Sequence, residues 1–428
     1  MRRPPHARAF LGLALAVAAG ATSSCTALLG IDADYRAEND GDSDAVAGDA
    51  EAGPAAEGGP PESAPPPDAG SDAFPANPGA IAEVTAGQFH TCVRFETGVA
   101  MCWGRAEDYG ELGNGTLANT SVAEPAMGAG IVHLFAGEHD TCAVLADGAA
   151  CAGKGGAGEL LDDVGDADSP VPVAETVLPA SPKAIASGLA FTCALLSTGD
   201  VVCVGDGTSG TLGNGGGGIS LEPVPIDLGG EQASAIAARN VHACAVLADG
   251  TVTCWGDGAS GPASVQGLPG AAVAVCTGDD FSCALVGNDE NSTVWCWGDN
   301  SGGELGNGDP GVSSSSTPVK VKGLAGAASL TCGSEHACAG TEYANPGIWC
   351  WGKGGSGQLG NEDTSNAYTP VQVSGISAYP ESLAAGGFHT CAILSSPNVL
   401  CWGSNDFGQL GDDSPDASSG PVSVTGIP

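Results

Sequence analysis

A cysteine-containing segment recurs seven times along the chain, and this repetition limits the possible folds more than any other feature. Two of the units read IASGLAFTCALLSTGDVVCVGDGTSGTLGNG (185–215) and LAAGGFHTCAILSSPNVLCWGSNDFGQLGDD (383–413). The first cysteines of successive units lie 50, 51, 51, 39, 55 and 53 residues apart; they are Cys92, Cys142, Cys193, Cys244, Cys283, Cys338 and Cys391. Self-similarity at this period indicates one supersecondary unit per repeat.

Each unit offers about four short strands. Alternating apolar residues flank a turn at Gly199 in one unit and at Asp249-Gly250 in the next, which predicts a β-hairpin. A further strand follows in several units, as in PVKV (318–321) or PVQV (370–373). Four strands per unit are typical of a propeller blade, so we expect an all-β, seven-bladed β-propeller over residues 79–428. A composition with 14% charged residues and 69 glycines also argues against long helices.

The hairpin in each unit carries one cysteine on each strand. Equal spacing from a central turn places the two side chains on one face, directly across the ladder, where the geometry suits a disulfide. Zinc sites need closer pairs than these, so we expect hairpin disulfides and no metal. The predicted pairs are Cys92–Cys102, Cys142–Cys151, Cys193–Cys203, Cys244–Cys254, Cys283–Cys296, Cys338–Cys350 and Cys391–Cys401.

Two further cysteines stand before the hairpins of adjacent units. Cys276 lies seven residues before Cys283, and Cys332 lies six residues before Cys338. They occupy nearly the same innermost-strand position in neighbouring blades, which suggests a disulfide between the blades. So many disulfides require an oxidising compartment.

The N-terminus independently indicates export. Arg2, Arg3 and Arg8 precede an apolar run, AFLGLALAVAA (9–19), that is too short to span a bilayer. Small residues then lead to Cys25, so residues 1–24 resemble a bacterial lipoprotein signal, although Thr22 stands where that signal prefers leucine. We expect lipidation of Cys25 and an outer-membrane or cell-surface location. Plain signal-peptide cleavage, giving a secreted or periplasmic protein, is the alternative.

Residues 25–78 are predicted to be a disordered acidic tether, because they contain almost no large apolar side chains. The part of the chain from 79 to 428 holds 38 acidic residues against 8 Lys and Arg, a net charge of −30. Such a field repels phosphate backbones, so we expect no nucleic-acid partner.

The motifs within the units are similar to those of the regulator of chromosome condensation repeat family. They appear here as GQFHTC (87–92), CWG (401–403) and GELGNG (303–308), and the resemblance covers about residues 80–428. It implies a seven-bladed propeller, and the paired cysteines look like those of exported bacterial relatives. It also implies, as an alternative function, guanine-nucleotide exchange. No unit has room for the wedge that the known exchanger inserts, because the largest step is 55 residues.

Histidines recur two residues before four of the first cysteines, at His90, His242, His336 and His389. A ring of histidines could bind a metal, but phenylalanine replaces the residue at Phe191 and Phe281. The family uses this histidine structurally, and we expect the same here. No motif supports a catalytic site or a cofactor, and a propeller-based lyase or hydrolase remains a second alternative.

One face of the propeller is the candidate binding surface. The G-x-x-H turn and the G-x-L-G-N-G loop of a unit are separated by two strands, so both emerge on the same face. The fourth unit lacks this loop, since 260–265 reads SGPASV, which predicts a notch in the rim. We expect a monomer that binds a protein or glycan partner, with ordinary loop decoration as the alternative. The expected surface residues are Phe89, Tyr109, Glu111, Asp280, Phe388 and Phe407.

Overall fold

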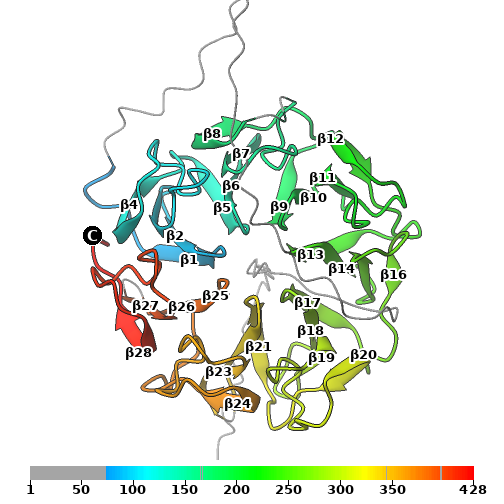
Figure 1. The fold of residues 1–428 in the computed structure, drawn as a ribbon, viewed down its shortest axis with the longest axis vertical. Helices are drawn as coiled ribbons and strands as arrows, with labels where there is room; N and C mark the ends of the chain where they lie inside the picture. Colours follow the sequence, from blue (N-terminus) through cyan, green and yellow to red (C-terminus); the bar gives the residue numbers. More distant parts are fainter. Residues whose placement is uncertain (1–73, 164, 166, 344, 396–397) are drawn as a thin grey trace, which may run out of the picture.

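The computed structural model describes residues 74–428 except 164, 166, 344 and 396–397. In this part of the chain, 28 strands form seven four-stranded antiparallel sheets arranged as blades around a central axis (Figure 1). The prediction of an all-β, seven-bladed propeller is confirmed. No helix in the described ranges is long and apolar enough to cross a membrane. The predicted signal peptide, Cys25 and nearly all of the predicted tether lie outside the described residues.

Each blade is built from four consecutive strands. The first blade contains β1 (Ile81–Ala86), β2 (His90–Phe95), β3 (Ala100–Gly104) and β4 (Thr120–Ala126), and the second contains β5 (Ile131–Ala136), β6 (Asp140–Leu145), β7 (Gly148–Gly153) and β8 (Ser169–Ala174). The third contains β9 (Pro182–Ser187), β10 (Phe191–Leu196), β11 (Val201–Asp206) and β12 (Ile219–Pro225), and the fourth contains β13 (Ala233–Arg239), β14 (His242–Leu247), β15 (Val252–Gly256) and β16 (Ala263–Ser264). The fifth contains β17 (Ala272–Thr277), β18 (Phe281–Val286), β19 (Thr293–Asp299) and β20 (Ser314–Lys320), and the sixth contains β21 (Ala327–Cys332), β22 (His336–Thr341), β23 (Gly347–Gly352) and β24 (Ala367–Gln372). The seventh contains β25 (Ser382–Ala385), β26 (His389–Ser395), β27 (Asn398–Gly403) and β28 (Ser418–Ser423).

The two middle strands of every blade are joined by a disulfide. In the first blade Cys92 on β2 lies directly opposite Cys102 on β3, and the equivalent cysteines face each other in the other six. Their Cα atoms are 4.0–4.1 Å apart. An eighth disulfide, Cys276–Cys332, joins the innermost strands β17 and β21 of neighbouring blades, with Cα atoms 5.6 Å apart.

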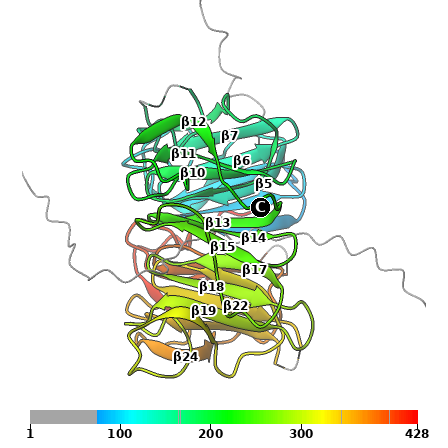
Figure 2. The same ribbon diagram turned by 90° about the vertical axis from the view of Figure 1, so that its right-hand side faces the viewer.

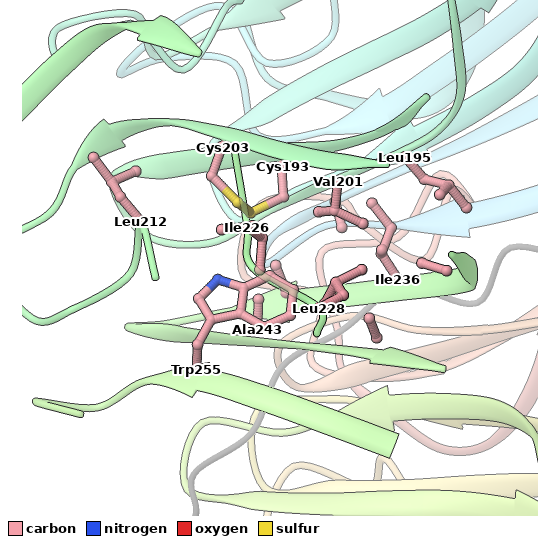
Figure 3. Packing of buried hydrophobic residues seen from close by; sticks show 14 of the residues in the cluster. Cys193, Leu195, Val201, Cys203, Leu212, Ile226, Leu228, Ile236, Ala243 and Trp255 are labelled. Atoms are coloured by element: carbon pink, nitrogen blue, oxygen red, sulfur yellow. A yellow bond between two sulfur atoms is a disulfide. The ribbon is translucent and has the colours of Figure 1, made fainter. Parts of the chain in front are cut away.

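In five of the seven blades a tryptophan follows the second cysteine and packs its blade onto the one before it. Trp402 is fully buried, and its indole N–H donates to the carbonyl of Gln358 in the preceding blade at 2.9 Å. Gly360 in that loop has φ +67°, and a Cβ there would lie 2.7 Å from Trp402 Nε1. The glycines of the G-x-L-G-N-G loop therefore provide the left-handed turn and the space that the ring needs. Figure 3 shows the equivalent junction at Trp255.

Three buried histidines link neighbouring blades through a threonine hydroxyl. His389 Nε2 lies 2.8 Å from Thr91 Oγ1, which donates to the carbonyl of Gln409 at 3.0 Å. His90 and His336 contact the equivalent threonines at 2.9 and 2.8 Å. Because the hydroxyl proton goes to the carbonyl, the histidine must donate its Nε2–H. Burial lowers the pKa of all three histidines to about 3, so they are neutral at pH 7.

Replacing His389 by phenylalanine is expected to make the protein less sensitive to acid. The folded-state pKa lies below the unfolded value of about 6.5, so this histidine contributes stability above pH 6.5 that is lost as the pH falls toward 3. Without it, the unfolding free energy should fall less steeply in that window, by up to about 1.4 kcal/mol per pH unit. Phenylalanine already occupies this position at Phe191 and Phe281.

Urea denaturation of both proteins between pH 4 and pH 7.5 checks this expectation. Buried Glu138 and Asp140 oppose the trend, because burial raises the pKa of each to about 7 and their contribution is lost as the pH rises. They are present in both proteins, so their effect cancels in the difference. Parallel pH profiles would show that His389 does not carry this linkage.

The ring closes between the seventh and first blades without exchanging a strand. The same contacts that join other blades join these two, including a hydrogen bond of 2.9 Å from Trp103 Nε1 to the carbonyl of Gln409. Phe74 packs edge-on against Phe95 at 5.8 Å, so the packed body includes a residue before the predicted start at 79. Figure 2 shows the ring from its edge.

The fourth blade is incomplete on its outer side. Its outer strand β16 has two residues, whereas those of the other blades have six or seven. Because the G-x-L-G-N-G loop is missing here, Trp297 of the next blade has no carbonyl to accept its indole N–H, although the ring is fully buried.

Candidate binding face

The turn after the first strand and the loop after the third strand meet in every blade. In the first blade the backbone N–H of Arg105 donates to the carbonyl of Phe89 at 2.9 Å. Matching bonds occur in the other six, for example from Ser404 to Phe388 at 2.8 Å. Both connections therefore lie at the same end of each blade and together form one face of the ring.

Three phenylalanine rings gather on this face where the ring closes. The centroid of Phe89 lies 5.0 Å from that of Phe407 and 6.3 Å from that of Phe388. Each side chain is partly exposed. Residues more than 290 positions apart thus form one aromatic surface, which we call the aromatic cluster.

The guanidinium of Arg105 packs against two rings of the aromatic cluster. Its guanidinium carbon lies 4.7 Å from the centroid of Phe89 and 5.7 Å from that of Phe407, within the range of a cation–π contact. Only 7% of the residue is exposed. Its nitrogens are held by Glu111 at 2.9 Å, by Asp108 at 3.2 Å and by His139 at 2.6 Å. These bonds fix the guanidinium, so the rings above it are presented on a rigid support.

Two groups that bind Arg105, His139 and Glu111, have shifted pKa values. Burial and the neighbouring Arg105 lower the pKa of His139 to about 3, so its Nδ1 accepts a hydrogen bond from the guanidinium. The His139 ring also lies 5.3 Å from the Tyr109 ring. Burial raises the pKa of Glu111 even though Arg105 opposes the shift.

One of the six predicted surface residues does not lie where we expected. Glu111 has no exposed surface, because its side chain turns inward to bind Arg105. Asp280 is exposed on the predicted face, in the β17–β18 turn of the fifth blade, whereas the aromatic cluster lies in the seventh and first blades. There burial and the charge of Asp280 raise the pKa of Asp257 to about 6. The structure brings Phe89, Tyr109, Phe388 and Phe407 together around Arg105.

A second polar cluster lies at the ends of the innermost strands on the same face. Arg239 stands where the other six units have glycine, and it is 2% exposed. Its Nε lies 3.4 Å from Asp279 Oδ1, and Glu138 from the second blade accepts a hydrogen bond from the N–H of Asn240. The adjoining cavity, lined in part by Gly87, has room for about one water molecule. Arg239 therefore lies buried between the ends of the innermost strands of several blades.

Among the described residues, one group of side chains has metal-like spacing. The sulfurs of Cys276, Cys283 and Cys332 lie within 4.8 Å of one another. All three are engaged in disulfides, and a metal requires free thiolates.

Comparison with known proteins supports the repeat assignment. The family model for the regulator of chromosome condensation (RCC1) repeat matches residues 291–339 and 347–393. A second model for the same repeat matches residues 183–211, 272–304 and 381–409.

Curated relatives contain the same repeats in longer chains. The human E3 ubiquitin-protein ligase HERC2 is 31% identical over 356 residues, which are 77% of this chain and 7% of HERC2. The mitochondrial RCC1 domain-containing protein RUG3 of Arabidopsis thaliana is 30% identical over 56% of this chain and 58% of its own length. This chain therefore spans only part of each relative.

A solved structure shows the same fold. Prp20p from Saccharomyces cerevisiae superposes with a TM-score of 0.68 at 17% identity, covering 80% of this chain and 88% of its own. That structure was described with its binding to Gsp1p and histones.

Proposed function

The chain belongs to the regulator of chromosome condensation repeat family, and from this premise we propose that it is a non-catalytic module that binds a protein partner through the aromatic cluster. The observation that carries the proposal is a cluster of three partly exposed rings, two of which, Phe89 and Phe407, lie over the buried guanidinium of Arg105. Aromatic residues over a fixed guanidinium resemble the anchors that dominate binding energy at protein interfaces. Their rigidity also reduces the entropy lost on association.

Acidic residues occur in the loops that form this site. Glu107 and Asp108 are exposed in the β3–β4 loop that carries Arg105, Asp406 is exposed next to Phe407 in sequence, and the chain from 79 to 428 carries a net charge of −30. We therefore expect the partner to present an apolar anchor flanked by basic residues, since such charges accelerate encounter and suppress acidic partners.

We further propose that the propeller acts outside the cytosol, held at the outer membrane or cell surface by lipid on Cys25. The argument is the N-terminal signal together with the disulfides in every blade, which persist in oxidising compartments. Replacing Cys25 by serine should move the protein from the membrane fraction to the soluble fraction. Retention in the membrane fraction would argue against the lipid anchor.

Replacing Phe407 by alanine is expected to weaken partner binding about 30-fold or more, in line with the loss of about 2 kcal/mol for a hot-spot residue. Partners captured from surface extracts by the purified propeller would be identified and their affinities measured by calorimetry. The matched control is Val132→Ser, which changes an exposed apolar residue at the far end of β5 from the β5–β6 turn. Equal affinity of F407A and wild type for every captured partner, including any glycan, would overturn the proposed site.

A further inference from the structure

In six of the seven blades a buried leucine belongs to the same apolar cluster as the cysteines of the hairpin disulfide. The leucine belongs to the G-x-L-G-N-G loop or its equivalent in the same blade, and it is at most 3% exposed. Figure 3 shows this arrangement in the third blade, where Leu212 packs beside Cys193–Cys203. These leucines are Leu112, Leu160, Leu212, Leu305, Leu359 and Leu410.

The fourth blade has no such leucine, because the loop that would carry it is replaced by the short segment 260–265. The apolar cluster around Cys244 contains Val265 and Trp297 instead. In this blade Cys254 is partly exposed, whereas the other fifteen disulfide-bonded cysteines are at most 1% exposed. Cys244 itself is completely buried, with its sulfur 3.9 Å from Ser282 Oγ.

Thiol–disulfide exchange requires a thiolate to approach one sulfur of the bond directly. A buried disulfide can react only after a local opening, whose free energy reduces the rate. The disulfides Cys193–Cys203 and Cys244–Cys254 have equal sequence spacing. We therefore expect their exchange rates to differ chiefly because a thiolate can reach one of them more easily than the other.

We propose that the notch in the fourth blade makes Cys254 a site of exchange with small thiols. An attacking thiolate forms a new S–S bond to Cys254, the Cys244–Cys254 bond breaks, and the electron pair leaves on the sulfur of Cys244. The products are a mixed disulfide on Cys254 and a thiolate on Cys244, which takes a proton from solvent. The ligand is a low-molecular-weight thiol, which becomes covalently attached to Cys254 at the notch in the fourth blade.

Reduced glutathione is the probe. The folded protein would be incubated with it for graded times, quenched with acid, alkylated with N-ethylmaleimide and mapped by mass spectrometry. We expect glutathione on Cys254 and N-ethylmaleimide on Cys244 at least about tenfold sooner than any modification of Cys193 or Cys203. Equal rates in the third and fourth blades, or simultaneous reaction of all disulfides, would overturn the proposal.

The variant Leu212→Ala tests the cause in the same molecule. It truncates the buried leucine of the third blade while leaving Cys193 and Cys203 in place. Exchange at Cys193–Cys203 should then accelerate toward the rate at Cys254, while the sixth-blade disulfide Cys338–Cys350 stays slow. Faster exchange in both blades would indicate general unfolding, and an unchanged rate in the third blade would exclude the leucine as the protecting group. Either result would count against the proposal.

Discussion

Replacing Trp402 by alanine is expected to lower the free energy of unfolding by about 3–5 kcal/mol. The ring is completely buried between the sixth and seventh blades, so the substitution leaves a large cavity at a blade junction. It also removes the hydrogen bond to the carbonyl of Gln358. Guanidinium denaturation followed by circular dichroism would measure the loss.

A pair of milder variants separates the hydrogen bond from the cavity. Trp402→Phe keeps an aromatic ring and removes the indole N–H, while Trp297→Phe removes an indole N–H that has no acceptor. We expect the former change to cost about 1 kcal/mol more than the latter. Equal losses would contradict the role assigned to the loop carbonyl in joining the blades.

Removing the disulfide between blades should cost more than removing a hairpin disulfide. In the unfolded chain Cys276–Cys332 closes a separation of 56 residues, whereas Cys391–Cys401 closes 10. Loop-closure entropy then gives about 4 kcal/mol for the first and about 3 kcal/mol for the second. The double variants Cys276→Ser/Cys332→Ser and Cys391→Ser/Cys401→Ser would be compared by denaturation under non-reducing conditions.

The comparison is balanced because all four cysteines are completely buried, so each double variant places two serine hydroxyls in the core. The difference between the variants therefore reports mainly on the crosslinks. A larger loss for the hairpin pair would mean that strain or residual structure, and not loop length, decides the contribution.

The architecture could be predicted from the sequence because every repeat contains the same hairpin pattern of two cysteines around a turn. The turn at Asp249-Gly250 centres the hairpin, and the cysteines at equal distances from it must face each other in an antiparallel ladder. Seven copies of this pattern define seven blades. The notch was also predictable, since the 39-residue step leaves no chain for a full outer strand.

The candidate site was less predictable because its contacts join residues far apart in the sequence. The aromatic residues Phe89 and Phe407 could be placed on one face from the strand count, but not beside each other across the ring closure. Arg105 was missed, since one arginine after a C-W-G strand end carries no signal by itself. Glu111 was misplaced for the same reason: its partner Arg105 draws it inward.

The special role of Arg239 can be recognised from the sequence, because it breaks the repeat pattern. Six units have glycine at this position and one has arginine, which is the least similar replacement in size and charge. A departure of this kind within a repeat indicates a position with a separate role. In the structure Arg239 is buried and pairs with Asp279.

A ring of seven blades, each crossed by its own disulfide, holds the aromatic cluster in place, and we propose that it does so outside the reducing cytosol. Mass spectrometry of a non-reduced digest of the protein, purified from the cell envelope, tests this claim most directly. We predict eight disulfides that pair each hairpin within its own blade and join Cys276 to Cys332. Free thiols at these sixteen positions, or pairs between hairpins of different blades, would contradict it.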